Sequence, residues 1–196
     1  MENIVVGLDI GTTKTCAVIG YLNENKQVEV VGVGNAPSRG LKNGVIVNID
    51  NTATSIEKAI EDAELMAGHE VSEVLVGVSG QHVKGENSRG VVAISNRSRT
   101  ISPIEVKRVI EAAQAIVIPV DREILHVLSK EFSVDDQTGI KDPIGMSGVR
   151  LEAEVHIITG STSSIQNMIK AVDKAGFQLK DVVFNPLASS DAVLSR

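Results

Sequence analysis

The sequence has 196 residues, of which 42% are hydrophobic and 2% aromatic, so its core must consist mainly of aliphatic side chains. The formal net charge of -6 argues against nucleic acid as a partner, because phosphate binding needs a basic surface. The sequence has a single cysteine, no signal-peptide pattern and no apolar run of about 20 residues, which predicts a cytoplasmic protein without an internal disulfide bond.

The first part of the chain predicts three strands joined by short turns, at residues 4–9, 15–22 and 28–33. Two hairpins in succession form a meander and not a βαβ unit. Residues 35–50 contain Pro37 and several glycines and are typical of a structured loop.

A helix is expected next, beginning at a capping box formed by Thr54 and Glu57. Gly68 is placed to end it, because glycine adopts the left-handed conformation common after a helix. A fourth strand is predicted at residues 74–79.

From about residue 81 the sequence becomes polar and basic. A second capping box at Ser102 and Glu105 predicts a helix to about residue 117. The remaining expected elements are strands at 90–94, 125–134, 149–159 and 179–184, and helices at 163–175 and from Asn185 onward. Without the middle segment the order is β-β-β-α-β-α-β-α, so we expect the middle to be an inserted domain.

The turn after the first strand reads Gly-Thr-Thr-Lys, unlike the Asn-Gly or Asp-Gly of ordinary hairpins. Amides of a glycine-containing turn can point at one anion, hydroxyls add donors and lysine adds positive charge. A carboxylate at the strand end can hold a hydrated Mg²⁺ that bridges phosphate oxygens. The predicted site residues are Gly11, Thr12, Thr13 and Lys14 for a nucleotide phosphate and Asp9 for the metal. A polar turn with a chance aspartate is the alternative.

A strand-turn-strand cradle followed by alternating helices and strands resembles the first half of the actin-like ATPase fold. Within that superfamily the chain is most similar to the bacterial cell-division family FtsA. The segments that carry the resemblance are residues 7–14, 31–50, 59–68, 78–83, 124–160 and 185–195. The segment 124–160 is the most specific, because sugar kinases and chaperones of the same fold lack it.

The resemblance implies an α/β fold, with an actin-like (ribonuclease H-like) domain 1A at residues 1–81 and 161–196. A smaller α/β domain 1C of the SHS2 type would be inserted at residues 82–160. The family's second lobe and its carboxyl-terminal membrane helix have no counterpart in this sequence. We therefore expect only half of an ATP and Mg²⁺ site, and little or no ATPase activity from this chain alone.

The family's role implies that the full-length protein assembles and anchors the FtsZ ring, with ATP as an assembly ligand. It would act on the cytoplasmic side of the membrane at the division site, and domain 1C would mediate self-association and recruit other division proteins. Residues 84–108 hold six basic side chains and two acidic ones. Arg97 and Arg99 are the expected contact residues in this segment, although a solvated charged face is the simpler interpretation.

Two other identities stay open at this stage. One is the first half of an actin-fold kinase that phosphorylates a small metabolite, although no carboxylate base or polar substrate pocket can be assigned. The other is a relative that recruits pilus components through the same kind of insertion. The four histidines are not spaced as zinc ligands with cysteine or acidic residues, so no zinc site is predicted.

Overall fold

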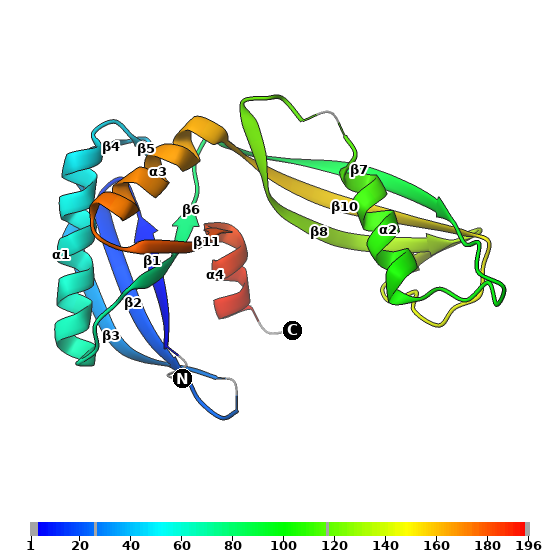
Figure 1. The fold of residues 1–196 in the computed structure, drawn as a ribbon, viewed down its shortest axis with the longest axis horizontal. Coiled ribbons are helices and arrows are strands. Elements are labelled where there is room, and N and C mark those ends of the chain that lie inside the picture. Colours follow the sequence, from blue (N-terminus) through cyan, green and yellow to red (C-terminus); the bar gives the residue numbers. More distant parts are fainter. Residues whose placement is uncertain (1–3, 26, 117, 195–196) are drawn as a thin grey trace. The chain divides into compact units, whose positions relative to one another are not determined.

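The structure is a computed structural model that describes residues 4–25, 27–116 and 118–194. The chain divides into two compact units, each with its own sheet (Figure 1). Unit 1 comprises Met1–Val83 and Gly160–Arg196, and unit 2 comprises Lys84–Thr159. Because the chain leaves unit 1 once and returns once, unit 2 is an insertion in unit 1.

A five-stranded sheet forms the centre of unit 1, in the order β11-β6-β1-β2-β3. Its strands are β1 (Ile4–Ile10), β2 (Lys14–Leu22), β3 (Val28–Pro37), β6 (Glu73–Val78) and β11 (Gln178–Phe184). The pairs β1–β2 and β2–β3 are antiparallel, which confirms the predicted meander, whereas β6 runs parallel to both β1 and β11. Parallel strands β1 and β6 bring their carboxyl ends to the same edge of the sheet.

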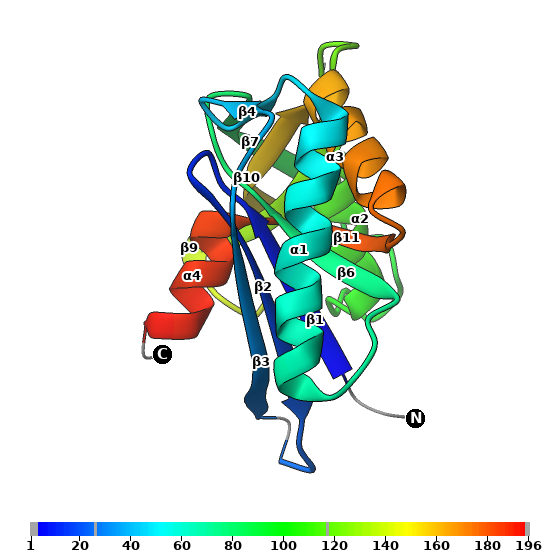
Figure 2. The same ribbon diagram turned by 90° about the vertical axis from the view of Figure 1, so that its left-hand side faces the viewer.

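Helices cover the two faces of this sheet unequally. Helices α1 (Ile49–Ala67) and α3 (Thr162–Lys174) pack on one face, and the short α4 (Asn185–Val193) lies on the other (Figure 2). The backbone of α1 approaches β3 closely, because a side chain at Gly32 or Gly34 would overlap the α1 carbonyls of Ala63 or Ala59. The core is aliphatic, as expected, and includes Val6, Leu8, Ala17, Ile19, Ile56, Ile60, Val74 and Val76.

The start of α1 differs from the prediction. The helix begins at Ile49, and the Asn48 side chain caps it by accepting a hydrogen bond from the Asn51 amide at 2.9 Å. Thr54 lies inside the helix and its hydroxyl donates to the Asp50 carbonyl, so the predicted capping box is wrong. Gly68 ends the helix with φ of 69°, as predicted.

The segment predicted as a structured loop contains a small hairpin of β4 (Leu41–Lys42) and β5 (Val45–Ile46). Asn43 and Gly44 join the two strands, and both have positive φ, of 52° and 76°. This is the backbone that a two-residue type I′ turn requires, and Asn-Gly is its preferred sequence. Strand β3 also runs four residues beyond its predicted end, to Pro37.

Unit 2 is a four-stranded sheet in the order β7-β10-β8-β9, with α2 (Pro103–Gln114) packed on one face. Its strands are β7 (Val83–Ala93), β8 (Arg122–Val134), β9 (Gln137–Ile140) and β10 (Arg150–Ser161). The core residues include Ile94, Ile101, Val109, Phe132, Leu151, Val155 and Ile157.

The capping box of α2 is present as predicted. The Glu105 carboxylate accepts from the Ser102 amide, and the Ser102 hydroxyl accepts from the Ile104 amide. The helix ends at Gln114, before its predicted end at about residue 117, which itself lies outside the described residues. Strand β7 begins at Val83, seven residues before its predicted start. Its polar, alternating sequence suits a strand with one exposed face, which hydrophobicity alone does not reveal.

Candidate functional site

The turn that links β1 to β2 closes through one backbone hydrogen bond, from the Gly11 amide to the Lys14 carbonyl at 3.1 Å. Gly11 is required for this geometry, since a Cβ atom there would lie 2.9 Å from that carbonyl oxygen. The turn is therefore tight. Asp9, Thr12, Thr13 and Lys14 all have exposed side chains around it.

The donor groups of the turn are largely uncommitted within the described part of the chain. Neither the Thr12 nor the Thr13 amide donates a hydrogen bond to another described residue. The Lys14 ammonium likewise forms no ion pair with the described acidic side chains. Unpaired amides beside a lysine are the donor set that an anion needs.

Neighbouring segments brace the turn on both sides. The Gly44 amide donates to the Thr12 hydroxyl oxygen at 2.9 Å, and the Ser38 amide donates to the Thr13 carbonyl at 3.1 Å. The buried Thr15 hydroxyl bonds the Ser38 hydroxyl at 2.8 Å. The β4–β5 hairpin and the end of β3 therefore hold the turn in one conformation, which lowers the entropic cost of binding a ligand there. Thr12 thus has a structural role that the sequence did not indicate.

Asp9 has a partner that sequence reasoning missed. Asn185, the first residue of α4, donates through Nδ2 to Asp9 Oδ1 at 2.8 Å. Asn185 fits only because residue 77 of β6 is glycine, since a Cβ atom at Gly77 would overlap Asn185 Oδ1. Asp9 and Gly77 are paired neighbours on β1 and β6, so three elements meet at this carboxylate. The only sequence signal was the start of a helix at Asn185-Pro186, directly after a parallel strand.

The arrangement fits a phosphate group with a hydrated divalent cation. The turn offers unpaired amides, hydroxyls and an ammonium group for phosphate oxygens. Asp9 keeps one carboxylate oxygen, Oδ2, clear of the bond to Asn185. Mg²⁺ keeps several of its waters and takes only one or two carboxylates, so a single aspartate is a suitable partner. No set of three or more His, Cys, Asp or Glu side chains forms a metal centre among the described residues.

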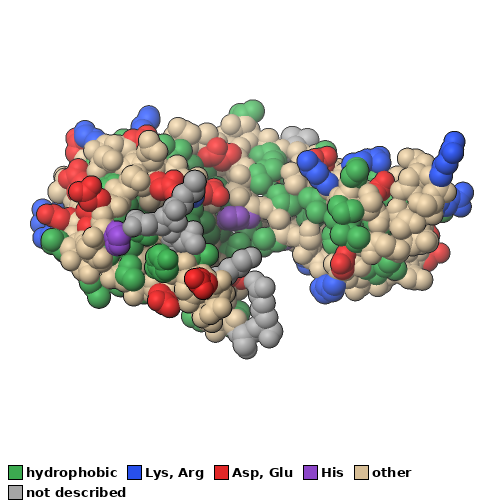
Figure 3. Space-filling view, turned by 60° about the horizontal axis from the view of Figure 1, so that its bottom comes forward, with side chains coloured by type: hydrophobic (Ala, Val, Ile, Leu, Met, Phe, Trp, Pro, Cys, Tyr) green, Lys and Arg blue, Asp and Glu red, His purple; other side chains and the backbone are tan. Residues whose placement is uncertain are grey.

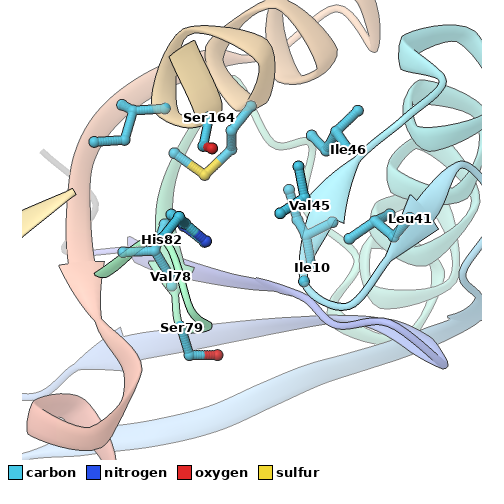
Figure 4. Close-up of a pocket in the computed structure, with 12 residues that line it drawn as sticks. Ile10, Leu41, Val45, Ile46, Val78, Ser79, His82 and Ser164 are labelled. Atoms are coloured by element: carbon cyan, nitrogen blue, oxygen red, sulfur yellow. The ribbon is translucent and has the colours of Figure 1, made fainter. Parts of the chain in front are cut away.

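A small pocket lies next to the turn within unit 1 (Figure 4). Its lining is mainly apolar and includes Ile10, Leu41, Val45, Ile46 and Val78, and the polar residues Ser79, His82 and Ser164 also line it. The pocket volume of about 30 Å³ has room for one or two water molecules and none for a nucleotide base. It belongs to the packing that supports the β4–β5 hairpin, and the described part of the chain encloses no nucleoside pocket beside the turn.

Arg97 and Arg99, predicted as interaction residues, lie far along the sequence in the loop between β7 and α2. Both side chains are exposed, and Arg99 has a positive φ of 49°. The pKa of Asp135 is lowered by the backbone amides of Arg150 and Val149, and also by the positive charges of Arg150 and Arg99. These two arginines are in unit 2, so they are not part of the site at the β1–β2 turn.

Comparison with known proteins gives consistent results over both units. Residues 80–159 match the family described as the SHS2 domain inserted in FTSA. The cell division protein FtsA of Borreliella burgdorferi is 54% identical over 195 residues, which are 100% of this chain and 47% of that protein. The Bacillus subtilis FtsA is 42% identical over 100% of this chain and 44% of its own length. The Escherichia coli FtsA is 37% identical, over 99% and 46% respectively.

The chain therefore spans about half the length of the curated relatives that it matches. Among solved structures, a PilM-PilN type IV pilus biogenesis complex is similar in fold, with a TM-score of 0.64 and 15% sequence identity. That match covers 95% of this chain and 49% of the other. The predicted fold class, an actin-like domain with an SHS2 insertion, is confirmed. Within the described ranges, no helix is both long and apolar enough to cross a membrane.

Proposed function

The chain belongs to the FtsA family of cell division proteins, and from this premise we propose that it carries the phosphate-binding half of an ATP site. The turn at residues 11–14 would hold the phosphates, and Asp9 would hold Mg²⁺ through water. When bound, Mg·ATP would act as a ligand that favours assembly. The residues of this chain would bind and orient it, without supplying a base to activate water.

One observation supports this proposal above the others. The β1–β2 turn is held rigidly by Gly44 and Ser38, yet its own amides at Thr12 and Thr13 make no hydrogen bond to described residues. A turn that served only to connect two strands would have no need of such bracing around unpaired donors. Asp9, fixed by Asn185, stands at the end of the adjacent strand where a phosphate-bound cation would lie.

Calorimetric titration of Mg·ATP tests the proposal. We expect weak binding to this chain and tighter binding to a version extended to the length of its relatives. In the extended protein Lys14→Ala should weaken binding about tenfold or more, because it removes a charge-assisted hydrogen bond. Lys42→Ala is the matched control, since Lys42 is also exposed but lies in β4 outside the turn, and it should change affinity little.

The opposite pattern would contradict the proposed site. If Asp9→Ala and Lys14→Ala bound Mg·ATP as tightly as the parent, the turn would not be the phosphate site. We also expect no phosphate release by this chain above the level of its Asp9→Ala variant. Clear turnover above that control would show that the chain supplies a complete active site by itself.

For the full-length protein we propose the family role of assembling and anchoring the FtsZ ring at the membrane of the division site. Unit 2 would mediate self-association and contacts with other division proteins, with Arg97 and Arg99 as contact residues. Their exposed side chains support this assignment. Co-sedimentation of the full-length protein with FtsZ polymers and vesicles would test the anchoring role, and failure to bridge the two would refute it.

A further inference from the structure

The loop between β7 and α2, which carries Arg97 and Arg99, has a backbone held by several hydrogen bonds. Asn96 organises residues 96–100: its Oδ1 accepts from the Thr100 amide at 3.1 Å, and its Nδ2 donates to the Thr100 carbonyl at 2.8 Å. The Arg99 amide donates to the Asn96 carbonyl, and the Arg99 carbonyl accepts from the Gly148 amide at 2.9 Å. We call residues 96–100 the arginine loop. Its backbone is ordered by these bonds, while the Arg97 and Arg99 side chains extend outward.

Apolar side chains flank the arginine loop within unit 2. Ile104, in the first turn of α2, is 69% exposed, and Ile144 is 50% exposed. The Gly145 amide donates to the Ile101 carbonyl at 2.9 Å, so the segment with Ile144 lies beside the start of α2. The surface around the loop is therefore both cationic and apolar. Lys and Arg side chains are visible on the surface in Figure 3.

The outer face of α1 in unit 1 has the complementary character. Glu57, Glu61 and Leu65 are spaced four residues apart and form one row along the helix, and Asp62 and Met66 lie in the adjacent row. Leu65 is 79% and Met66 65% exposed. The three acidic side chains form no ion pair with any described residue, although Lys58 lies among them. We call these five residues the α1 patch.

The charged and apolar side chains of the α1 patch do little to stabilise the monomer. Glu57 and Glu61 are like charges at a spacing of four residues, which destabilises a helix slightly. Two large apolar side chains exposed side by side at the end of an amphipathic helix contribute nothing to the core. A surface that combines uncompensated charge with exposed apolar groups is typical of a contact with another molecule.

We propose that the α1 patch is the docking surface for the arginine loop of a second copy of this chain. The inference rests on the proposed self-association through unit 2 and names the surface that unit 2 would bind. Arg97 and Arg99 would pair with Glu57 and Glu61. The exposed Ile104 and Ile144 would meet Leu65 and Met66 at the edge of the contact.

The spacing of the charges on the two surfaces agrees. Residues four apart on a helix are separated by about 6 Å along its axis. Two residues separated by one other in a turn are at most about 7 Å apart. Two adjacent arginine–carboxylate pairs can therefore form at once, and arginine binds carboxylates through two parallel hydrogen bonds.

The contact would be heterologous, because the two surfaces are different and belong to different units of the chain. An open assembly would keep one unused surface of each kind, the arginine loop at one end and the α1 patch at the other. Such contacts produce open chains unless the rotation between copies closes a ring. Since the contact depends on exposed charges, it should weaken as salt rises above the physiological range.

Sedimentation velocity of the 196-residue chain at several protein and salt concentrations tests the inference. The α1 variant carries Glu57→Lys and Glu61→Lys, and the loop variant carries Arg97→Glu and Arg99→Glu. Each alone should lower the association constant by about tenfold or more. An equimolar mixture of the two variants should recover association, because acidic loops then meet lysine-bearing helices while the native contact forms in the other direction.

A matched control separates this contact from a general effect of charge. Glu24→Lys combined with Asp191→Lys changes the net charge equally at exposed positions outside the α1 patch, and it should leave association unchanged. Circular dichroism should confirm that every variant is folded.

Three results would overturn the inference: no association of the parent chain, an unaffected α1 variant, or a mixture that fails to associate. If only the loop variant associates weakly, self-association through unit 2 stands and the α1 patch is the wrong partner surface. The Mg·ATP titration is independent of all these outcomes.

Discussion

At the scale of single residues, the candidate site depends on a contact between two side chains that lie 176 positions apart, Asp9 and Asn185. The contact fixes the carboxylate that would face the cation. It requires a glycine at position 77, because any side chain there would take the space of the Asn185 amide. Gly7 lies on the same face of the adjacent strand β1, and a Cβ atom at that position would have open space around it.

Gly77→Ala should therefore lower the free energy of unfolding by about 1–3 kcal/mol, the usual cost of forcing extra atoms into a packed site. It should also weaken Mg·ATP binding in the extended protein, because Asn185 can no longer hold Asp9. Gly7→Ala is the matched control and should change stability by less than about 0.5 kcal/mol. Urea unfolding of the three proteins measures the difference, and equal stability of both variants would contradict the steric argument.

At the scale of elements, the boundaries were harder to predict than the elements themselves. Strands β1 and β2, the end of α1 and the start of α2 follow from hydrophobic patterns, Gly68 and the Ser102 capping box. The predicted start of α1 was wrong because both Asn48 and Thr54 have side chains suited to capping a helix. Only tertiary structure decides between them, since Asn48 also has its backbone amide bonded to the Gly40 carbonyl at 3.1 Å.

The two possible caps of α1 can be separated by substitution. Asn48→Ala should destabilise the protein by about 1 kcal/mol, because the Asn51 amide loses its partner. Thr54→Ala should have an effect within about 0.5 kcal/mol, since Thr54 is exposed in the helix interior and alanine has the higher helix propensity. Thermal unfolding monitored by circular dichroism measures both. A larger loss for Thr54→Ala would restore the capping box that the sequence suggested.

The turn residues of the candidate site were all identifiable from sequence, but their surroundings were not. Glycine, hydroxyls and a lysine between two short strands are local features of residues 11–14. The bracing of Thr12 by Gly44 and the pairing of Asp9 with Asn185 join segments that are distant in sequence. The prediction also missed the first seven residues of β7. The polar residues there resemble a loop as long as the packing of the strand in its sheet is unknown.

At the scale of the whole molecule, the two units have separate cores and different electrostatic stabilisation. Three acidic groups of unit 2, Glu105, Asp135 and Glu154, have a lowered pKa. The main causes are the hydrogen bond from Ser102 to Glu105, the backbone amide of Arg150 at Asp135, and the hydrogen bond from Lys130 to Glu154. Each group is held in its ionised form by the folded unit.

Acid should therefore destabilise unit 2. A lowered pKa gives stability that is complete above the unfolded value, about 4.3 for Glu and 3.9 for Asp, and is lost as pH falls through the folded value. Dispersed amide signals of unit 2 should collapse in nuclear magnetic resonance spectra before those of unit 1 as pH falls below about 4. Glu105→Gln should reduce this difference in acid sensitivity, and simultaneous collapse of both units at every pH would contradict it.

The route of the chain into and out of unit 2 has a consequence for how this architecture can change. The carbonyl of His82, directly before β7, accepts from the Ser161 amide, and Asn87 of β7 bonds His156 of β10, so β7 and β10 run antiparallel and side by side. The two places where the chain enters and leaves unit 2, after Val83 and before Gly160, are therefore close together. An inserted domain that is connected through two adjacent strands can be exchanged for another domain, or replaced by a short hairpin, without changing the connections of the five-stranded sheet. The same scaffold is thus suited to acquiring new partners by grafting, in evolution and in the laboratory.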